Sequence, residues 1–182
     1  MREDVLMVGL GGQGVLVAGE ILARAATLTG LEVSWFPAYS PEVRGGEATC
    51  TVVLADGPVG SPIVGRPHNL VLMDAGAVER HLPRAAAGGV AIVNSSLAPD
   101  VPLREGVLVV SIPANDIAVA AGTERAVNMV MLGGLLAVKP VITLEQCEAA
   151  IADAFGAKRP ALVPINVEAL RAGYAAARAA LE

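Results

Sequence analysis

The chain has 182 residues and a formal net charge of −5, and its composition is 54 % hydrophobic but only 3 % aromatic. This length predicts one domain with a full hydrophobic core, and the shortage of positive charge argues against a nucleic-acid partner or a polybasic membrane contact. No apolar run reaches the roughly 18 residues that a membrane-spanning helix needs.

Apolar runs and helical periodicities then alternate along the first two-thirds of the chain. In chain order they predict a strand over 5–9, a helix over 15–30, strands over 31–36, 47–55 and 69–74, a helix over 76–87, strands over 90–93 and 107–112, and helices over 116–121, 125–138, 144–155 and 167–181. Because strands alternate with helices until the last third, the predicted fold class is α/β, with a mostly parallel sheet and a helical C-terminal third.

The first strand is followed by a glycine-rich turn, Gly9-Leu10-Gly11-Gly12-Gln13-Gly14, which has the spacing G-x-G-x-x-G. A strand, a glycine turn and a helix together point free backbone N–H groups at an anion, near the positive end of the helix dipole. An NAD site also needs an acidic residue at the end of the second strand, about 20 residues on. Here that strand ends W-F-P-A-Y-S, without an acid. The turn therefore predicts an anion site and not an NAD site.

Two other interpretations of the turn stay open. Arg44 could meet the 2′-phosphate of NADP, which would make the chain a free-standing NADP or flavin oxidoreductase. Alternatively, the glycines only permit a tight turn and close helix–sheet packing, and the chain is a structural module.

The two cysteines, Cys50 and Cys147, stand far apart and form no C-x-x-C pair. This pattern excludes an iron–sulfur cluster or a four-cysteine zinc site built by this chain alone. Together with a first segment unlike a signal peptide, it favours the reducing cytoplasm.

A second stretch, residues 37–62, is less generic. It reads P-A-Y-S-P-E-V-R-G-G-E-A-T-C and onward, so that Pro41 and the Gly45-Gly46 pair enclose Glu42 and Arg44 in a loop. Together with G-L-G-G-Q-G, this loop resembles the gamma subunit, or gamma domain, of 2-oxoacid:ferredoxin oxidoreductases. The resemblance continues in order over residues 88–97, 112–118, 128–137 and 165–174. It implies one gamma domain over residues 1–182, with a Rossmann-like three-layer fold.

The resemblance implies a subunit of an oxidoreductase and not a whole enzyme. The complete enzyme would decarboxylate a 2-oxoacid oxidatively with coenzyme A, giving an acyl-CoA, CO2 and reduced ferredoxin. We expect 2-oxoglutarate as the substrate, with pyruvate, 2-oxoisovalerate and indolepyruvate as alternatives. Thiamine diphosphate, Mg²⁺ and a [4Fe–4S] cluster would lie on alpha and beta subunits. In an alternative composition, the complex would also contain a delta subunit. This chain would carry no catalytic residue and no metal, would meet ferredoxin indirectly, and could pair with itself when isolated.

The same resemblance suggests that the gamma domain helps to hold coenzyme A. The predicted contact residues are Gly11, Gly12, Gln13 and Gly14 of the turn, with Arg44, Gly45 and Asn94. Arg44 would be a charge-assisted donor to phosphate, and Gln13 and Asn94 would be neutral hydrogen-bond partners. The alternatives are that Arg44 pairs with Glu42 or a partner subunit, and that Asn94 serves a turn or a cap.

Several other polar or sulfur-bearing residues receive structural interpretations. Asn128 begins an apolar helix, where it would be an N-terminal cap or an interface residue. His81 is interpreted as an ordinary surface histidine, and Cys50 as a core residue. Thr143 and Gln146 have the spacing of a capping box. Asp74 ends a strand without a second carboxylate beside it, so acid–base chemistry is not predicted there.

Overall fold

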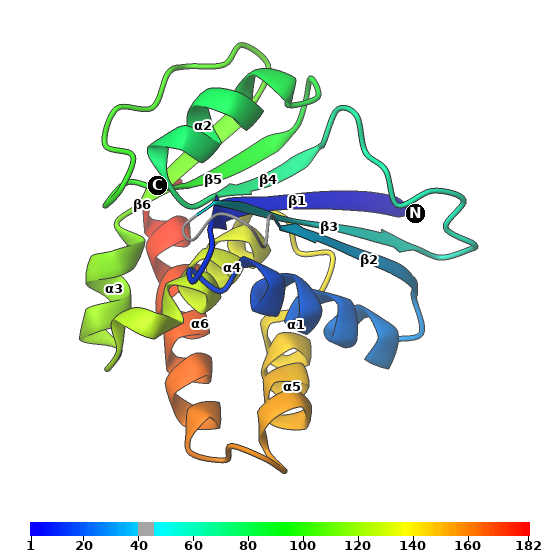
Figure 1. Ribbon diagram of the computed structural model, residues 1–182, viewed down its shortest axis with the longest axis vertical. Coiled ribbons are helices and arrows are strands. Elements are labelled where there is room, and N and C mark those ends of the chain that lie inside the picture. Colours follow the sequence, from blue (N-terminus) through cyan, green and yellow to red (C-terminus); the bar gives the residue numbers. More distant parts are fainter. Residues whose placement is uncertain (40–45) are drawn as a thin grey trace.

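The computed structural model describes residues 1–39 and 46–182, so Arg44 and Gly45 lie outside the described residues. Figure 1 shows a central sheet with helices on both faces. The elements are β1 (Arg2–Leu10), α1 (Val15–Leu28), β2 (Glu32–Tyr39), β3 (Glu47–Ala55), β4 (Asn69–Leu72), α2 (Ala75–His81), the 3-10 turn Leu82–Arg84, β5 (Val90–Asn94), β6 (Leu108–Ile112), α3 (Ala114–Ala120), the 3-10 turn Glu124–Ala126, α4 (Val127–Val138), α5 (Leu144–Phe155) and α6 (Leu162–Ala179).

The sheet has the strand order β2-β3-β1-β4-β5-β6. The pairs β1–β4, β4–β5 and β5–β6 are parallel, which confirms the mostly parallel sheet. The strand β3 is the exception, since it runs antiparallel to both β1 and β2 and separates them. Its first residue, Glu47, therefore pairs with Leu10, the last residue of β1. The start of β3 thus lies beside the glycine turn.

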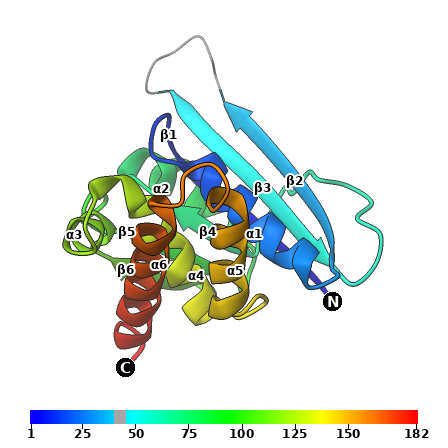
Figure 2. The same ribbon diagram turned by 90° about the horizontal axis from the view of Figure 1, so that it is seen from below.

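The helices divide unequally between the two faces of the sheet. One face carries α2, and the other carries α1, α4, α5 and α6 (Figures 1 and 2). Each layer has its own hydrophobic core, a large one under the four helices and a smaller one under α2. All residues of β4 and β5 are buried, as expected for central strands covered on both faces. The three-layer α/β fold is confirmed.

Helix α4 is the centre of the larger layer, because its residues 127–137 are all buried. It crosses α6 at two glycines: a Cβ on Gly133 would overlap the carbonyl oxygen of Leu170, and a Cβ on Gly173 would overlap that of Val130. The two backbones therefore touch, and this contact is possible only without side chains at the crossing. The methionines Met129 and Met131 are fully buried in this helix and serve packing.

Some predicted bounds were wrong. The predicted helix 76–87 ends at His81 and continues as a 3-10 turn that contains Pro83. The last helix begins at Leu162, earlier than predicted, because Pro164 lies in its first turn, where a missing N–H leaves no intrahelical hydrogen bond unmade. The capping box at Thr143 and Gln146 is confirmed in both directions. Among the described residues, the helices are too short or too polar to cross a membrane.

Candidate functional site

The glycine turn connects the carboxyl end of β1 to α1. Gly12 and Gly14 have φ values of 98° and 77°, a left-handed conformation that favours glycine. The side-chain oxygen of Gln13 accepts a hydrogen bond from the Leu10 N–H at 2.6 Å, and the Gln13 N–H donates to the Leu10 carbonyl at 3.1 Å. Gly11 donates to the carbonyl of Gly46, just before β3, at 2.9 Å. The oxygen of Gln13 therefore closes the turn.

No side chain among the described residues caps the amino end of α1. Gly14 is its N-cap, and its first turn holds no acidic residue. The first N–H groups of an α-helix have no partner inside the helix, and they coincide with the positive end of the helix dipole. Because Gly11 and Gly12 are exposed, an anion can approach this end from solvent. The turn thus has the geometry that an anion site needs, and the binding of an anion there stays a prediction.

Two clefts flank the amino end of α1, and both are lined by Gly14 and Val17. The first, which we call the turn cleft, has about 360 Å³ and is otherwise lined by Leu10, Gly11, Gly12, Val15, Leu16 and Ala48. The second, which we call the arginine cleft, has about 480 Å³ and is otherwise lined by Thr123, Arg125, Ala126, Asn128, Phe155, Arg159, Leu162, Ile165 and Asn166. One cleft is therefore lined by glycines and apolar residues, and the other contains two arginines.

Asn128 joins α4 to the glycine turn. Its side-chain nitrogen donates to the Gly14 carbonyl at 3.0 Å, and the residue is only 5 % exposed. The N-cap of α4 is Ala126, so the interpretation of Asn128 as a helix cap was wrong. Its side-chain oxygen is buried without a hydrogen-bond partner among the described residues. The sequence indicated none of this, because the contact joins residues 114 positions apart.

Asn94 ends β5 and is fully buried. Its nitrogen donates to the Met73 carbonyl at 3.1 Å and to the Asn115 side chain at 2.8 Å, while its oxygen accepts from the backbone N–H groups of Ser96 and Ala114. These four bonds use the whole hydrogen-bonding capacity of the amide. Neither cleft is lined by Asn94. The structure therefore brings Gly11–Gly14 together and leaves Asn94 apart from them.

A polar cluster on the α2 side of the sheet is absent from the sequence prediction. Glu47, beside the turn, accepts from Arg80 at 2.8 Å and lies 3.2 Å from the ring of His81. Burial opposes the ionisation of Glu47, but the hydrogen bonds from Arg80 and His81 hold its pKa below the usual range. His81 is only 7 % exposed, so its interpretation as a surface histidine was wrong.

Asp74 has a structural role at the end of β4. One of its oxygens accepts from the Ala77 N–H at 3.0 Å, which caps α2. Among the described residues, no three histidine, cysteine, aspartate or glutamate side chains gather as metal ligands.

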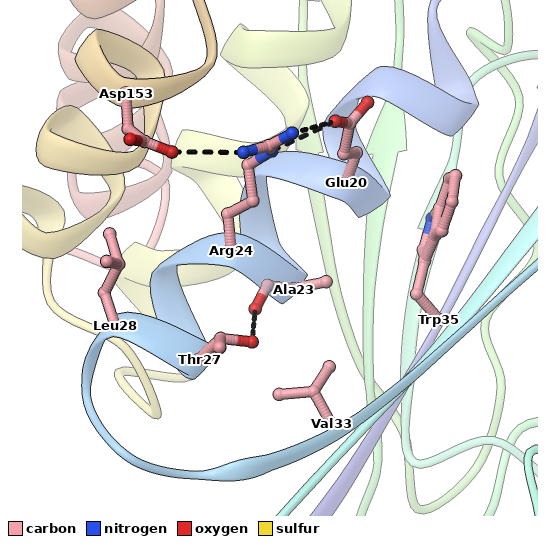
Figure 3. A pocket seen from close by; sticks show the side chains of 8 residues that line it. All are labelled: Glu20, Ala23, Arg24, Thr27, Leu28, Val33, Trp35 and Asp153. Carbon is pink, nitrogen blue, oxygen red and sulfur yellow. Dashed lines mark hydrogen bonds and ion pairs between the residues drawn. The ribbon is translucent and has the colours of Figure 1, made fainter.

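A third cleft, of about 450 Å³, lies between α1, β2 and α5 (Figure 3). Arg24 lies between Glu20 and Asp153, with hydrogen bonds of 2.9 to 3.0 Å to the two carboxylates. Trp35, on the edge strand β2, forms the opposite wall. Because the charge of Arg24 is already balanced, this cleft offers no free cation to an anionic ligand.

Comparison with known proteins identifies the protein family to which the chain belongs. The family model for pyruvate ferredoxin/flavodoxin oxidoreductase matches residues 4–176, and the chain belongs to this family. The ketoisovalerate oxidoreductase subunit VorA of Methanothermobacter marburgensis is 37 % identical over 179 residues, which are 98 % of this chain and 37 % of VorA. The chain thus spans little more than a third of that relative. The 2-oxoglutarate synthase subunit KorC of Methanocaldococcus jannaschii is 35 % identical over 156 residues, covering 84 % of this chain and 83 % of KorC.

Within the family, the chain is similar to gamma subunits, which confirms the resemblance found in the sequence. The gamma subunit of a keto/oxoacid ferredoxin oxidoreductase from Geobacter sulfurreducens superposes with a TM-score of 0.85 at 29 % identity, covering 99 % of this chain and 98 % of that one. A 2-oxoglutarate:ferredoxin oxidoreductase from Magnetococcus marinus, with 2-oxoglutarate, coenzyme A and succinyl-CoA bound, gives a TM-score of 0.87 at 26 % identity. That match covers 98 % of this chain and 31 % of the other.

Proposed function

We propose that the chain is the gamma component of a thiamine-dependent 2-oxoacid:ferredoxin oxidoreductase and contributes part of its coenzyme A site. The observation that carries the proposal is the uncapped amino end of α1, where free N–H groups meet two clefts at Gly14. Coenzyme A has a diphosphate at its centre, and backbone N–H groups at a helix terminus are suited to bind it. Membership of the family and the coenzyme A named with the Magnetococcus enzyme support this choice of ligand.

Gly12 and Gly14 would hold the diphosphate through backbone N–H groups, and Gln13 would keep the turn closed around it. The N–H of Gly11 already donates to the Gly46 carbonyl, so Gly11 would contribute by holding the turn against the start of β3. Arg44 and Gly45 stay predictions from the sequence, as phosphate ligands on the loop after β2. Asn94 would act indirectly, because its hydrogen bonds to Met73, Asn115 and neighbouring backbone hold the ends of β4 and β5 together.

The reaction of the complete complex would be the oxidative decarboxylation of a 2-oxoacid with coenzyme A, and the electrons would pass to ferredoxin or a similar acceptor. Thiamine diphosphate with Mg²⁺ supplies the decarboxylation chemistry and a [4Fe–4S] cluster carries the electrons, all on alpha and beta partners. The preference for 2-oxoglutarate stays a prediction, since relatives are named for ketoisovalerate, 2-oxoglutarate, indolepyruvate and pyruvate. The substrate pocket would lie on the partner subunits.

The turn is tested by Gly12→Ala with Gly30→Ala as a matched control. Both glycines have left-handed φ values, 98° and 82°, and a Cβ at either position meets no atom within 4 Å. Each substitution therefore adds similar backbone strain, about 1 kcal/mol or somewhat more, but only Gly12 lies at the proposed phosphate site. Calorimetric titration of coenzyme A into the assembled complex should show affinity lowered about tenfold or more by Gly12→Ala and unchanged by Gly30→Ala.

The melting temperatures of the two variants show whether both substitutions lower the stability of the fold equally. We expect equal losses of stability with unequal losses of coenzyme A affinity. Unchanged affinity in Gly12→Ala would show that the turn does not hold the ligand, and equal losses of affinity would assign the effect to the backbone of α1 as a whole.

A further inference from the structure

The arginine cleft contains two cations that no acid among residues 1–39 and 46–182 neutralises. Arg125 lies in the short 3-10 turn before α4, and Arg159 precedes α6. Both are exposed, and neither forms an ion pair with any described residue. In contrast, Arg24 and Arg171 are each held by carboxylates. Two unpaired guanidinium groups in one concave site are suited to bind an oxyanion, because each presents a fork of donors that matches phosphate.

Asn128 gives a second and independent indication of a ligand in this cleft. It lines the cleft, it is only 5 % exposed, and its side-chain oxygen has no hydrogen-bond partner in the described part of the chain. A buried polar atom without a partner is costly, and few are left so in native proteins. Its nitrogen is already used by the Gly14 carbonyl. The free oxygen is therefore an acceptor for a donor that enters the cleft from outside the chain.

The two clefts differ in a way that matches the two arms of coenzyme A. They meet at Gly14 and Val17, next to the free N–H groups of α1. From the diphosphate, one arm of coenzyme A is the largely uncharged pantetheine, and the other is adenosine with a 3′-phosphate. Of the described residues, those that line the turn cleft carry no charge, whereas the arginine cleft has two charged residues, together with the apolar surface of Phe155 and Ile165.

We propose that the arginine cleft binds the 3′-phosphoadenosine end of coenzyme A, with Arg125 and Arg159 on the 3′-phosphate and the oxygen of Asn128 accepting from the nucleoside. The pantetheine arm then leaves along the turn cleft. This assignment rests on the proposed function and adds to it a reason for specificity: the cleft distinguishes coenzyme A from the same molecule without its 3′-phosphate. None of these three residues belongs to the glycine motif.

The experiment is calorimetric titration of the assembled complex with coenzyme A, 3′-dephospho-coenzyme A and NADP⁺. The variants are Arg125→Ala and Arg159→Ala, and Lys158→Ala is the matched control. Lys158 neighbours Arg159 and carries the same charge, but it does not line the cleft. The wild type should bind coenzyme A about tenfold or more tightly than the dephospho form, as expected for a lost charge-assisted contact.

Each arginine variant should lose affinity for coenzyme A while keeping that for the dephospho form, so that the ratio of the two falls towards one. Lys158→Ala should keep the wild-type ratio. Equal binding of both forms by the wild type, or a ratio unchanged in both arginine variants, overturns the assignment but leaves the proposed function intact. Binding of NADP⁺ with no binding of coenzyme A overturns the proposed function itself.

Discussion

At the scale of single residues, tertiary neighbours determined roles that the residue types alone did not reveal. His81 looked like a surface histidine, but it lies buried against Glu47 and Arg84. Asn94 looked like either a ligand or a turn residue, and its four internal hydrogen bonds favour the second role. Cys50 was correctly interpreted as core, because a cysteine among β-branched residues in a strand points to burial.

The two cysteines allow a prediction at this scale. Both are free thiols, and burial raises the pKa of Cys50 and of Cys147 to about 12. At pH 8 the thiolate fraction, and with it the alkylation rate, should be about a thousandfold lower in the folded chain than after unfolding. The alkylation rate is measured by counting iodoacetamide adducts over time by mass spectrometry, in the folded and in the unfolded chain. Rapid labelling of either thiol in the native chain would contradict the buried environment.

The same pKa values give the sign of a pH dependence. The folded pKa of each thiol is above its value of 9.0 in the unfolded chain, because burial favours the neutral form. The stability contributed by the two neutral thiols is therefore fully present below about pH 9 and is lost as the pH rises towards about 12.

At the scale of elements, local pattern identified most helices and strands, but it did not identify how closely they pack. The last helix, α6, is rich in alanine and has few charges. It buries Ala169, Leu170, Gly173 and Ala177 within the chain. Its contact with α4 depends on Gly133 and Gly173, where each glycine faces a backbone carbonyl of the other helix. Glycine in a helix interior usually weakens the helix, so these two residues serve the crossing and not the helix.

Gly133→Ala should lower the free energy of unfolding by about 3 kcal/mol, at the upper end of the cost of overpacking, because backbone atoms cannot move aside. For a chain of this size, that corresponds to a fall in melting temperature of about 6 to 12 °C. Gly134→Ala is the matched control in the same helix, since the atoms nearest to its Cβ are side-chain atoms of Ile112, Ile92 and Ala177 and not backbone atoms. The melting temperatures of the two variants are measured by thermal unfolding, monitored by circular dichroism. Equal melting temperatures would contradict the close crossing.

At the scale of the whole molecule, the chain has the fold of a gamma subunit, and its proposed chemistry needs partners. The edge strand β2 leaves Trp35 and Phe36 about half exposed, at 41 % and 50 %. The described residues hold no cluster of potential metal ligands. The clefts at α1 offer binding groups, and the reacting centre would come from other subunits.

We therefore expect the purified chain alone to be colourless and to oxidise neither NADPH nor a 2-oxoacid. Co-expression with thiamine- and cluster-bearing partners should give a stable complex with coenzyme A-dependent decarboxylation. Absorption spectra and enzyme assays on the chain and on the complex test this expectation. Reduction of a substrate with NADPH by the isolated chain would instead favour the alternative of a free-standing oxidoreductase.

The sequence by itself determined the α/β class, the glycine turn and the family, because these depend on local periodicity and on motifs of neighbouring residues. Only the tertiary structure decided that β3 runs antiparallel between β1 and β2, since strand pairing is a contact between distant segments. The same holds for the arginine cleft. Its residues come from the start of α1, from the start of α4 and the segment before it, and from the segment that joins the end of α5 to the start of α6. Folding alone brings Gly14, Arg125 and Arg159 to one ligand-sized space.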